Sequence, residues 1–597
     1  MRKRPGFTVI LLLIAGLSLA LPTLFAAGNG KEKTGASGPL PKLVVLIVVD
    51  SMRADYPERF SPFFGEKGFR RLAREGRVFT HARFSHATTL TGPGHSVIGS
   101  GIYGDRSGIV GNRWYSYETG EDGNCARGPV REGTPGECEP EGKGAGPASG
   151  AKKMKNPCAF DGKTLAERVK ERYPGARVVG VAVKDRAAIL MAGKKADAAY
   201  WVEVNEDGSA ALACPGYYPA CHPKVLAYGE EEGLPEKPGP AESMTLFRRH
   251  PVWREWSCSL PSPCEKACPD DVVEAHSEDA GLGKSFPHPV KDPDSLLYTP
   301  YGDELLEGLA ERVVEVHGLG RNARGAPDVL VAGFSSTDYF GHLFGPDSCE
   351  AADGMKRLDG TVGRFLEFLT ARIGKESLLV FVTGDHGMAP LPEVSLRKGI
   401  PAGRLDLATP VSRQKGKIGD LSPLRQRLEF ELARRFGDPM SADTPLSEAF
   451  ITAYHEPGLY LNREKIGKKN LSLCRSWLKE HLLRLEGIRE VHTSDEIEAG
   501  EAPEPVRLAY RADRSGDLLV FTRKYWTVSG PGGGADHGQL HDYDTRVPLL
   551  VWGGGVVPGV EMGAVDVAQI APTLAALLGL DASGFSRPSP LPLGRSK

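Results

Sequence analysis

The 597-residue sequence predicts an α/β protein in which helices cover both faces of a central, mostly parallel β-sheet. The first observation is a set of short, uninterrupted apolar runs rich in β-branched residues, as expected of strands that are buried on both faces. The second is that helical patterns separate these runs, which is typical of a three-layer α/β/α arrangement. The five runs are Leu43–Val49, Val178–Val183, Val329–Phe334, Leu378–Val382 and Val547–Trp552.

Helical patterns fill the gaps between these strands. Apolar or aromatic residues recur at i, i+4 spacing at Leu165, Val169 and Tyr173, which places them on one face of a helix. The segment Leu305–Val316 is also predicted to be helical, and Val565–Leu580 is predicted as an amphipathic helix that closes the fold. Strand and helix therefore alternate, and we expect one sheet domain with large insertions rather than several separate domains.

The overall composition excludes several classes of protein. Lys and Arg total 74 and Asp and Glu total 76, so the formal net charge is −2. A protein that binds nucleic acids or anionic membrane surfaces would carry an excess of Lys and Arg over Asp and Glu. We therefore expect no nucleic acid as a specific partner. The sequence does not indicate an oligomeric state.

The first residues predict export. A basic start at residues 2–4 precedes an apolar stretch at residues 9–21 and two alanines at residues 26–27, which is the pattern of a cleaved signal peptide. An uncleaved N-terminal anchor is the alternative. No later segment has the roughly 18 uncharged apolar residues that a spanning helix needs. We expect a signal peptide at residues 1–27, a flexible leader at residues 28–41, and a periplasmic or secreted protein without stable membrane insertion.

Polar side chains follow four of the five predicted strands. Any single Asp after a strand is more often a helix N-cap than a ligand, but four such strand ends together favour a binding site. Open α/β sheets bind ligands beyond the carboxyl ends of their strands, and Asp and His suit Zn²⁺ and similar ions. The sequence therefore suggests a two-metal site. The residues concerned are Asp50, Lys184, Arg186, Asp338, His342, Asp385 and His386.

The segment around Thr91 offers a nucleophile. Thr91 precedes the run Gly92-Pro93-Gly94-His95, at a point where a helix can begin. A hydroxyl at a helix start lies near exposed N–H groups and the positive end of the helix dipole, which favour an alkoxide and a bound phosphate. The alternative is that Thr91 only caps the helix. We expect His95 to be a buried structural histidine.

Together, these stretches resemble the alkaline phosphatase superfamily, and most closely its phosphate-irrepressible type. The superfamily also includes the related nucleotide pyrophosphatase/phosphodiesterases. The matching stretches are VVLIVVDSMRADY, TGPGHSVIGSGIYGDRSGIVGN, VAVKDRAAIL, FSSTDYFGHLFGP, VTGDHGM and ADHGQLHDYDTRVPLLVWG. They are spread over the chain from residue 43 to residue 553, and the set is more specific than any one of its members.

The resemblance implies an alkaline-phosphatase-like core and a set of site residues. Two Zn²⁺ are implied as cofactors, one held by Asp50, Asp385 and His386 and the other by Asp338, His342 and His537. Thr91 is implied as the nucleophile and as a metal-binding group, with Asn112 as a phosphate-oxygen donor. Lys184 and Arg186 are implied as a phosphate clamp.

The function implied is that of an exported, zinc-dependent phosphomonoester hydrolase. It would act on small-molecule phosphate esters with broad specificity, through a phosphothreonine intermediate. The Lys-x-Arg pair favours a monoester, because the related nucleotide pyrophosphatase/phosphodiesterases usually lack it. A phosphodiesterase on the same scaffold is the first alternative. A non-catalytic, metal-stabilised binding protein is the alternative from another class.

The insertions divide the sequence further. We assign residues 42–117, 158–202, 296–392 and 535–590 to the catalytic core. Residues 393–534 are expected to form a small α+β cap, with helices at Leu424–Phe436 and Leu473–Leu485 and strands at Ala449–Leu461 and Asp517–Thr522. Three aromatic residues, Tyr525 and Trp526 in the cap and Tyr543 just after it, either contact substrate or pack.

The cysteines mark two further insertions, at residues 118–157 and 203–295. Eight of the ten cysteines fall between residues 125 and 268. In an exported protein we expect disulfides there, and the sequence does not decide their pairing. A structural zinc is the alternative.

Overall fold

The computed structural model describes residues 39–131, 136–139, 154–205, 209–232, 251–261, 281–407, 416–530 and 532–594. The predicted signal peptide, and all of the predicted leader before residue 39, lie outside these residues. None of the helices in the described part combines the length and the apolar character that crossing a membrane requires.

The core is a nine-stranded sheet with the order β19-β2-β18-β11-β1-β10-β5-β6-β7. At its centre β1 (Leu43–Val49) runs parallel to β10 (Asp328–Phe334) on one side and to β11 (Leu378–Gly384) on the other. β5 (Val178–Ala182) continues the parallel arrangement beyond β10. Every residue of these four strands is buried, which explains why the sequence shows continuous apolar runs there.

The outer strands are less regular. β6 (Ala198–Val204) pairs parallel with β5, and β7 (Ala210–Ala213) turns back along it. On the other side β18 (Leu549–Gly553), the fifth predicted strand, runs antiparallel to both β11 and β2 (Arg77–Arg83). β19 (Gly559–Asp566) pairs parallel with β2. The sheet is thus mostly parallel, as the sequence predicts.

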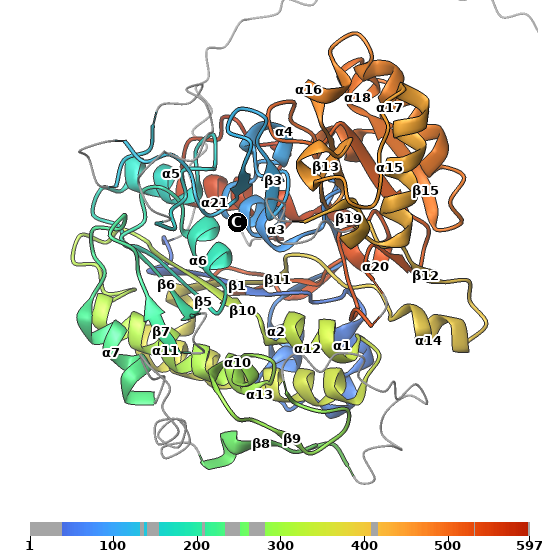
Figure 1. The fold of residues 1–597 in the computed structure, drawn as a ribbon. Helices are drawn as coiled ribbons and strands as arrows, with labels where there is room; N and C mark the ends of the chain where they lie inside the picture. The colour runs from blue at the N-terminus through green and yellow to red at the C-terminus, as the bar shows by residue number, and fades with distance from the viewer. Residues whose placement is uncertain are drawn as a thin grey trace, which may run out of the picture. The chain divides into compact units, whose positions relative to one another are not determined.

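Helices cover both faces of the sheet (Figure 1). Successive residues of β1 alternate between two hydrophobic clusters, with Val45 and Ile47 in one and Val44 and Leu46 in the other. On the first face lie α2 (Phe69–Glu75), α11 (Tyr301–His317), α12 (Ser336–Phe344) and α13 (Cys349–Ile373). On the second face lie α3 (Thr91–Ser100), α5 (Leu165–Arg172), α6 (Asp185–Ala192) and α21 (Ile570–Leu578).

The closing helix is shorter than predicted. Val565 and Asp566 belong to β19, a 3₁₀ turn covers Val567–Gln569, and only then does α21 begin. Most side chains of α21 are buried, so the helix is part of the second core rather than a half-exposed amphipathic element.

Residues 418–528 contain a smaller α+β unit with its own hydrophobic cluster. Its antiparallel sheet has the order β13-β14-β16-β15. One long strand predicted at Ala449–Leu461 is in fact a hairpin, and Pro457 lies in its turn, where no backbone N–H is needed. The elements are β13 (Ile451–His455), β14 (Gly458–Leu461), β15 (Ile488–Thr493), β16 (Leu518–Thr522), α15 (Pro423–Phe436), α16 (Arg463–Ile466), α17 (Leu471–Leu482), α18 (Ser494–Glu498) and α19 (Glu504–Leu508).

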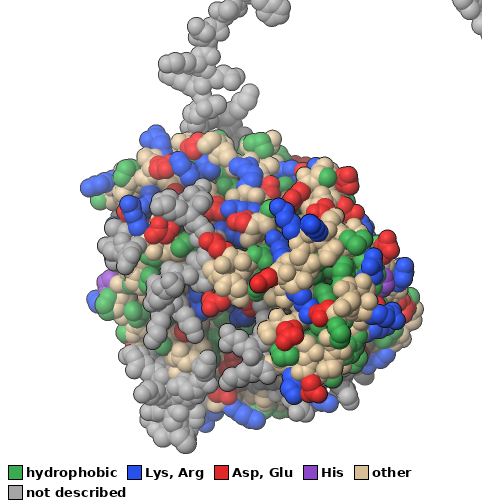
Figure 2. Space-filling model, turned by 45° about the horizontal axis from the view of Figure 1, so that its top comes forward, with side chains coloured by type: hydrophobic (Ala, Val, Ile, Leu, Met, Phe, Trp, Pro, Cys, Tyr) green, Lys and Arg blue, Asp and Glu red, His purple; other side chains and the backbone are tan. Residues whose placement is uncertain are grey.

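Short elements complete the described chain. These are α1 (Tyr56–Arg59), α4 (Gly104–Ser107), α7 (Pro223–Glu232), α10 (Pro293–Leu297), α14 (Pro392–Arg397), α20 (Asp542–Thr545), and the paired strands β3 (Arg113–Tyr115) with β4 (Asp122–Asn124), β8 (Glu255–Trp256) with β9 (His288–Pro289), and β12 (Gly403–Arg404) with β17 (Trp526–Thr527). Acidic and basic side chains are interspersed over the face shown in Figure 2, in line with the near-zero net charge.

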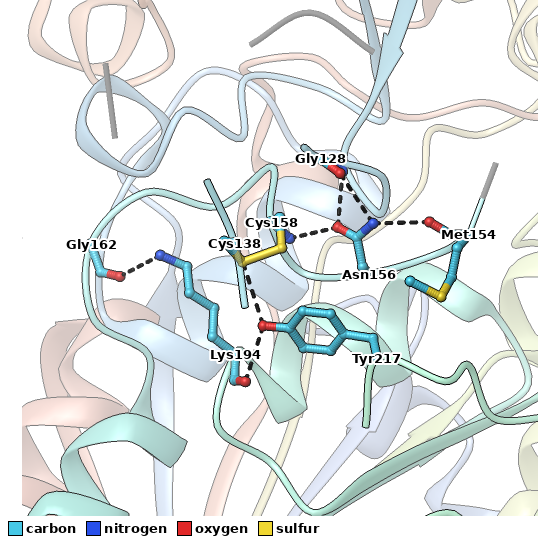
Figure 3. The surroundings of a disulfide bond; sticks show 8 residues. All are labelled: Gly128, Cys138, Met154, Asn156, Cys158, Gly162, Lys194 and Tyr217. Atoms are coloured by element: carbon cyan, nitrogen blue, oxygen red, sulfur yellow. Dashed lines mark hydrogen bonds between the residues drawn. A yellow bond between two sulfur atoms is a disulfide. The ribbon is translucent and has the colours of Figure 1, made fainter. Parts of the chain in front are cut away.

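Several cysteines of the insertions pair as expected. Figure 3 shows the disulfide Cys138–Cys158, beside which the buried Asn156 accepts hydrogen bonds from the backbone N–H groups of Gly128 and Cys158. A second disulfide joins Cys214 to Cys221. Cys258 and Cys349 are also disulfide-bonded. The expectation is wrong for Cys125, which is a buried free thiol, as is Cys474. Cys264 and Cys268 lie outside the described residues.

Candidate active site

Five of the predicted ligands lie at the carboxyl ends of three adjacent strands. Asp50 directly follows β1, Asp338 and His342 lie on α12 after β10, and Asp385 and His386 directly follow β11. Because these strands are parallel neighbours, their ends meet at one edge of the sheet. Asp338 and His342 are one turn apart on α12 and therefore face the same way, as their spacing predicts.

One predicted triad is assembled around Asp338. The Nε2 atoms of His342 and His537 lie 3.3 Å and 3.6 Å from Oδ1 of Asp338. Ligand atoms of these three residues lie within 4.8 Å of one another, close enough to share one ion. His537 comes from a distant segment of the chain, just before α20, so the fold rather than local sequence brings it here.

The side chains of the second predicted triad also lie close together. Nε2 of His386 lies 3.4 Å from Oδ1 of Asp50 and 3.3 Å from Oδ2 of Asp385. The group whose ligand atoms all lie within 4.8 Å is Asp50, Asp338 and His386, so Asp338 lies between both groups. Asp385 is not a member of this group, although its Oδ2 is close to His386, and its role as a ligand beside Asp50 and His386 stays a prediction.

The three histidines are oriented in a way that suits a metal ion. In each ring Nδ1 lies within hydrogen-bond distance of a backbone carbonyl oxygen, and because a carbonyl only accepts, Nδ1 donates, which leaves Nε2 as the nitrogen that can offer a lone pair to a metal ion. The acceptors are Ala535 for His342 at 2.6 Å, Thr89 for His537 at 2.8 Å and Gly387 for His386 at 2.9 Å. All three Nε2 atoms are directed toward the carboxylates, so the donor set fits one or two divalent cations.

Three carboxylates are buried together at this edge, beside a buried lysine. Asp50, Asp338 and Asp385 are buried together, and burial and the two neighbouring carboxylates raise the pKa of Asp50 to about 7. Lys184 lies 2.7 Å from Oδ2 of Asp50 and also contacts the carboxylate of Asp338. Burial alone would lower the pKa of Lys184, but these two carboxylates raise it above its usual value. Lys184 therefore lies as a cation between two of the three carboxylates.

Thr91 stands at the beginning of α3 with its hydroxyl free of any capping role. Leu90 occupies the N-cap position and no side chain caps the helix, so the capping alternative for Thr91 is wrong. Oγ1 of Thr91 lies 3.5 Å from Nε2 of His386, one of the candidate metal ligands. Two other hydroxyls precede Thr91 in the sequence, those of Thr88 and Thr89, and Oγ1 of Thr89 donates a hydrogen bond to the carbonyl oxygen of Gln539. Oγ1 of Thr88 has no hydrogen-bond partner among the described residues.

Asn112 is oriented by the first turn of α3. Its Oδ1 accepts a hydrogen bond of 2.7 Å from the backbone N–H of Gly92, which leaves its amide N–H groups to donate elsewhere. A side chain at Gly92 would place Cβ 2.8 Å from Sγ of Cys125 and 2.9 Å from Oδ1 of Asn112. Only glycine therefore permits this contact.

Lys184 and Arg186 come from the start of α6, where Lys184 is the N-cap residue. Burial alone would lower the pKa of Arg186, but the neighbouring Asp185, Cys125 and Tyr339 raise it above its usual value. Tyr339 is a residue that the sequence did not single out: its ring centroid lies 5.0 Å from Nζ of Lys184, within cation–π range. The only signal for it is that it follows Asp338 directly.

Comparison with known proteins identifies the family. Residues 44–544 match the family described as type I phosphodiesterase/nucleotide pyrophosphatase. The chain belongs to this family. One relative is the alkaline phosphatase PafA of Elizabethkingia meningoseptica, which is 27% identical over 92% of this chain and 93% of that protein. A protein named calcium-transporting ATPase, from Myroides odoratus, is 30% identical over 91% and 92% of the two chains.

Solved structures of PafA confirm the predicted fold class and the resemblance to the alkaline phosphatase superfamily. The wild-type crystal structure of PafA matches this protein with a TM-score of 0.74 and 26% identity, and the match covers 91% of this chain and 97% of PafA. A second PafA structure, with the same TM-score and 25% identity, is a variant in which one Thr, one Asn, one Lys and one Arg are replaced. Its Thr and Asn are 21 positions apart and its Lys and Arg two apart. Thr91 and Asn112, and Lys184 and Arg186, have the same separations.

Replacement of Gly92 by alanine tests the contact between α3 and Asn112. We expect Gly92→Ala to lower the free energy of unfolding by about 1–3 kcal/mol, because the new Cβ overlaps Cys125 and Asn112. Denaturant unfolding followed by circular dichroism measures the loss. The double variant Gly92→Ala/Cys125→Ala removes one of the two overlaps and is expected to recover part of it. An unchanged stability of Gly92→Ala would contradict the close contact.

Proposed function

We propose that the protein is an exported, zinc-dependent phosphomonoester hydrolase that uses Thr91 as its nucleophile. One observation supports this above all: three histidine Nε2 atoms and the buried carboxylates converge on one edge of the sheet, with the Thr91 hydroxyl 3.5 Å from His386. Membership in a hydrolytic family whose relatives include alkaline phosphatases agrees with the proposal. The variant of PafA with the same residue spacings supports the choice of Thr91, Asn112, Lys184 and Arg186.

The proposed cofactor is two Zn²⁺. Asp338, His342 and His537 would hold one ion, and Asp50, Asp385 and His386 the other. When bound, zinc supplies a Lewis acid that stabilises charge on oxygen and lowers the pKa of a bound hydroxyl or water. The three histidines are prepared for this role, since their Nδ1 protons are already donated to backbone carbonyl groups.

The proposed reaction has two displacement steps. In the first, the Thr91 hydroxyl loses its proton, its oxygen bonds to phosphorus, and the bond between phosphorus and the alcohol oxygen of the ester breaks. The product is a phosphothreonine, and the alcohol leaves with a proton. In the second, water attacks the phosphothreonine, the bond between Thr91 and phosphorus breaks, and inorganic phosphate leaves.

The remaining side chains bind the phosphoryl group. Asn112 is directed by Gly92 so that its amide N–H groups are available to a phosphate oxygen. Arg186 would bind two oxygens at once, while Lys184 acts as a point charge. Together with two zinc ions and three aspartates, these cations leave a net positive site, which favours the dianion of a monoester over the singly charged diester.

A phosphodiesterase is the second candidate, because the family description itself names that activity. The Lys184 and Arg186 pair favours the monoester, as the additional cations match the additional negative charge. Export is part of the proposal and is supported by the disulfides Cys138–Cys158 and Cys214–Cys221, since disulfides persist in oxidising compartments.

Substitution of the nucleophile tests the chemistry. We expect Thr91→Ala to lower kcat for 4-nitrophenyl phosphate by at least about 10³-fold, because no covalent intermediate can form. Thr91→Ser keeps a hydroxyl and should retain much of the activity. Thr88→Val, which removes a neighbouring hydroxyl without a hydrogen-bond partner among the described residues, is the matched control and should behave like the wild type. Full activity of Thr91→Ala would contradict the assignment.

Substitution of Arg186 separates the two candidate functions. The wild type is expected to hydrolyse 4-nitrophenyl phosphate with a higher kcat/KM than bis(4-nitrophenyl) phosphate. Arg186→Ala should lower kcat/KM for the monoester by about 10²-fold and change that for the diester much less, because the monoester dianion carries one more negative charge and one more non-bridging oxygen for the guanidinium to bind. Arg186→Lys, which keeps the charge without the paired N–H donors, should lie between them. A wild type that prefers the diester would favour the phosphodiesterase.

A further inference from the structure

The first turn of α3 lies directly against the backbone of the loop that follows β11. A side chain at Gly94 would place its Cβ 2.2 Å from the carbonyl oxygen of Asp385, so only glycine fits there. Contact between two backbones leaves little room for relative movement. The helix that begins with Thr91 and the loop that contains Asp385 are therefore held at a fixed separation.

His95 bridges the same contact with its side chain. The ring is fully buried, and its Nδ1 lies 2.9 Å from the carbonyl oxygen of Thr91 and 3.0 Å from Oδ2 of Asp385. Both neighbours are acceptors, so Nδ1 carries the proton, which it donates to the Thr91 carbonyl oxygen. Oδ2 of Asp385 contacts the same N–H closely and has no hydrogen-bond partner of its own among the described residues. Nε2 of His95 has no hydrogen-bond partner in the described part of the chain. The polar contacts of this ring are thus directed at the nucleophile's own backbone and at one carboxylate.

The two oxygens of Asp385 are held by different groups. Oδ1 accepts hydrogen bonds from the backbone N–H groups of Ser51, at 3.0 Å, and His386, at 2.9 Å. These bonds hold Oδ1, and the position of Oδ2 depends on its own neighbours. Oδ2 lies near Nδ1 of His95 and Nε2 of His386. Because Nε2 of His386 keeps its lone pair, His95 is the one of these two groups whose N–H lies against Oδ2, as a close electrostatic contact rather than a hydrogen bond.

We propose that His95 is a positioning residue of the two-metal site. It fixes the rotation of the Asp385 carboxylate and ties this predicted ligand to the helix that begins with Thr91. The inference rests on the proposed function, since it requires Asp385 to bind a metal ion. A histidine that only fills the core, as the sequence suggested, would affect stability and leave metal affinity unchanged. Groups that orient a metal ligand typically contribute 10- to 100-fold, in round numbers, to metal affinity.

The test is the zinc affinity of the full-length protein, measured by competition with a chromophoric chelator. His95→Leu removes the donor and keeps a comparable apolar volume, and it is expected to weaken zinc binding by about 10- to 100-fold. His95→Asn keeps an N–H close to the position of Nδ1 and should stay within about threefold of the wild type. If His95→Leu fails to fold, His95→Gln takes its place in the comparison with His95→Asn. The glutamine moves the N–H donor toward the position of Nε2, so His95→Gln should bind zinc more weakly than His95→Asn.

His86→Leu is the matched control. His86 is a second buried histidine near this site, and neither of its ring nitrogens has a hydrogen-bond partner among the described residues. Its replacement removes a buried ring without removing the N–H that lies against Asp385, and should leave zinc affinity unchanged. Thermal unfolding in excess chelator reports the packing cost of every variant separately from metal binding.

Two results would overturn the inference. If His95→Leu binds zinc as tightly as the wild type, His95 is a packing residue only. If His86→Leu weakens binding as much as His95→Leu, the effect belongs to the loss of a buried ring. If the wild type itself does not bind zinc, the proposed function is overturned as well. In the two results above the wild type binds zinc, so the failure of the inference and the failure of the proposed function can be told apart.

Discussion

The burial of three carboxylates at one edge of the sheet is the constraint on which the rest of the site depends. Asp50, Asp338 and Asp385 are each at most 3% exposed, and isolated buried charges are costly unless they are paired or bound to metal. Lys184 lies as a cation between Asp50 and Asp338. Divalent cations held by the same carboxylates and by the histidines would add further positive charge. The proposed chemistry and the local electrostatics therefore have a common origin.

The fold creates this edge through its core packing. β1 is buried on both faces, and its alternate side chains enter two separate hydrophobic clusters, so the strand cannot shift in register without exposing apolar surface. Asp50 is therefore fixed at the point where β1 ends. Glycines at 92 and 94 allow α3 to approach Asn112 and Asp385 closely, which places the Thr91 hydroxyl beside His386. Apolar packing and glycine contacts together determine the positions of the polar groups.

Much of this arrangement could be predicted from local sequence. The range Leu43–Val49 was predicted to the residue, because a strand buried on both faces has a continuous apolar pattern and ends at a polar residue. Asp338 and His342 could be placed on one helical face from their spacing alone. Most other residues of the candidate site could be identified from the sequence because they follow the apolar strands directly.

Other features depend on contacts between distant segments, and local patterns do not contain them. The direction of β18 could not be predicted from Val547–Trp552, because an apolar run looks the same in a parallel and an antiparallel strand. The free thiol of Cys125 depends on which cysteines meet in space. The contact between His95 and Asp385 spans almost half the chain, so the sequence left His95 as a structural histidine.

The central claim is that these strand-end residues hold two metal ions beside Thr91. Anomalous diffraction at the zinc absorption edge, from crystals of the zinc-loaded protein, tests it most directly. The account predicts two anomalous peaks, one among Asp338, His342 and His537 and one beside Asp50 and His386. A single peak, or no peak at this edge of the sheet, would contradict it.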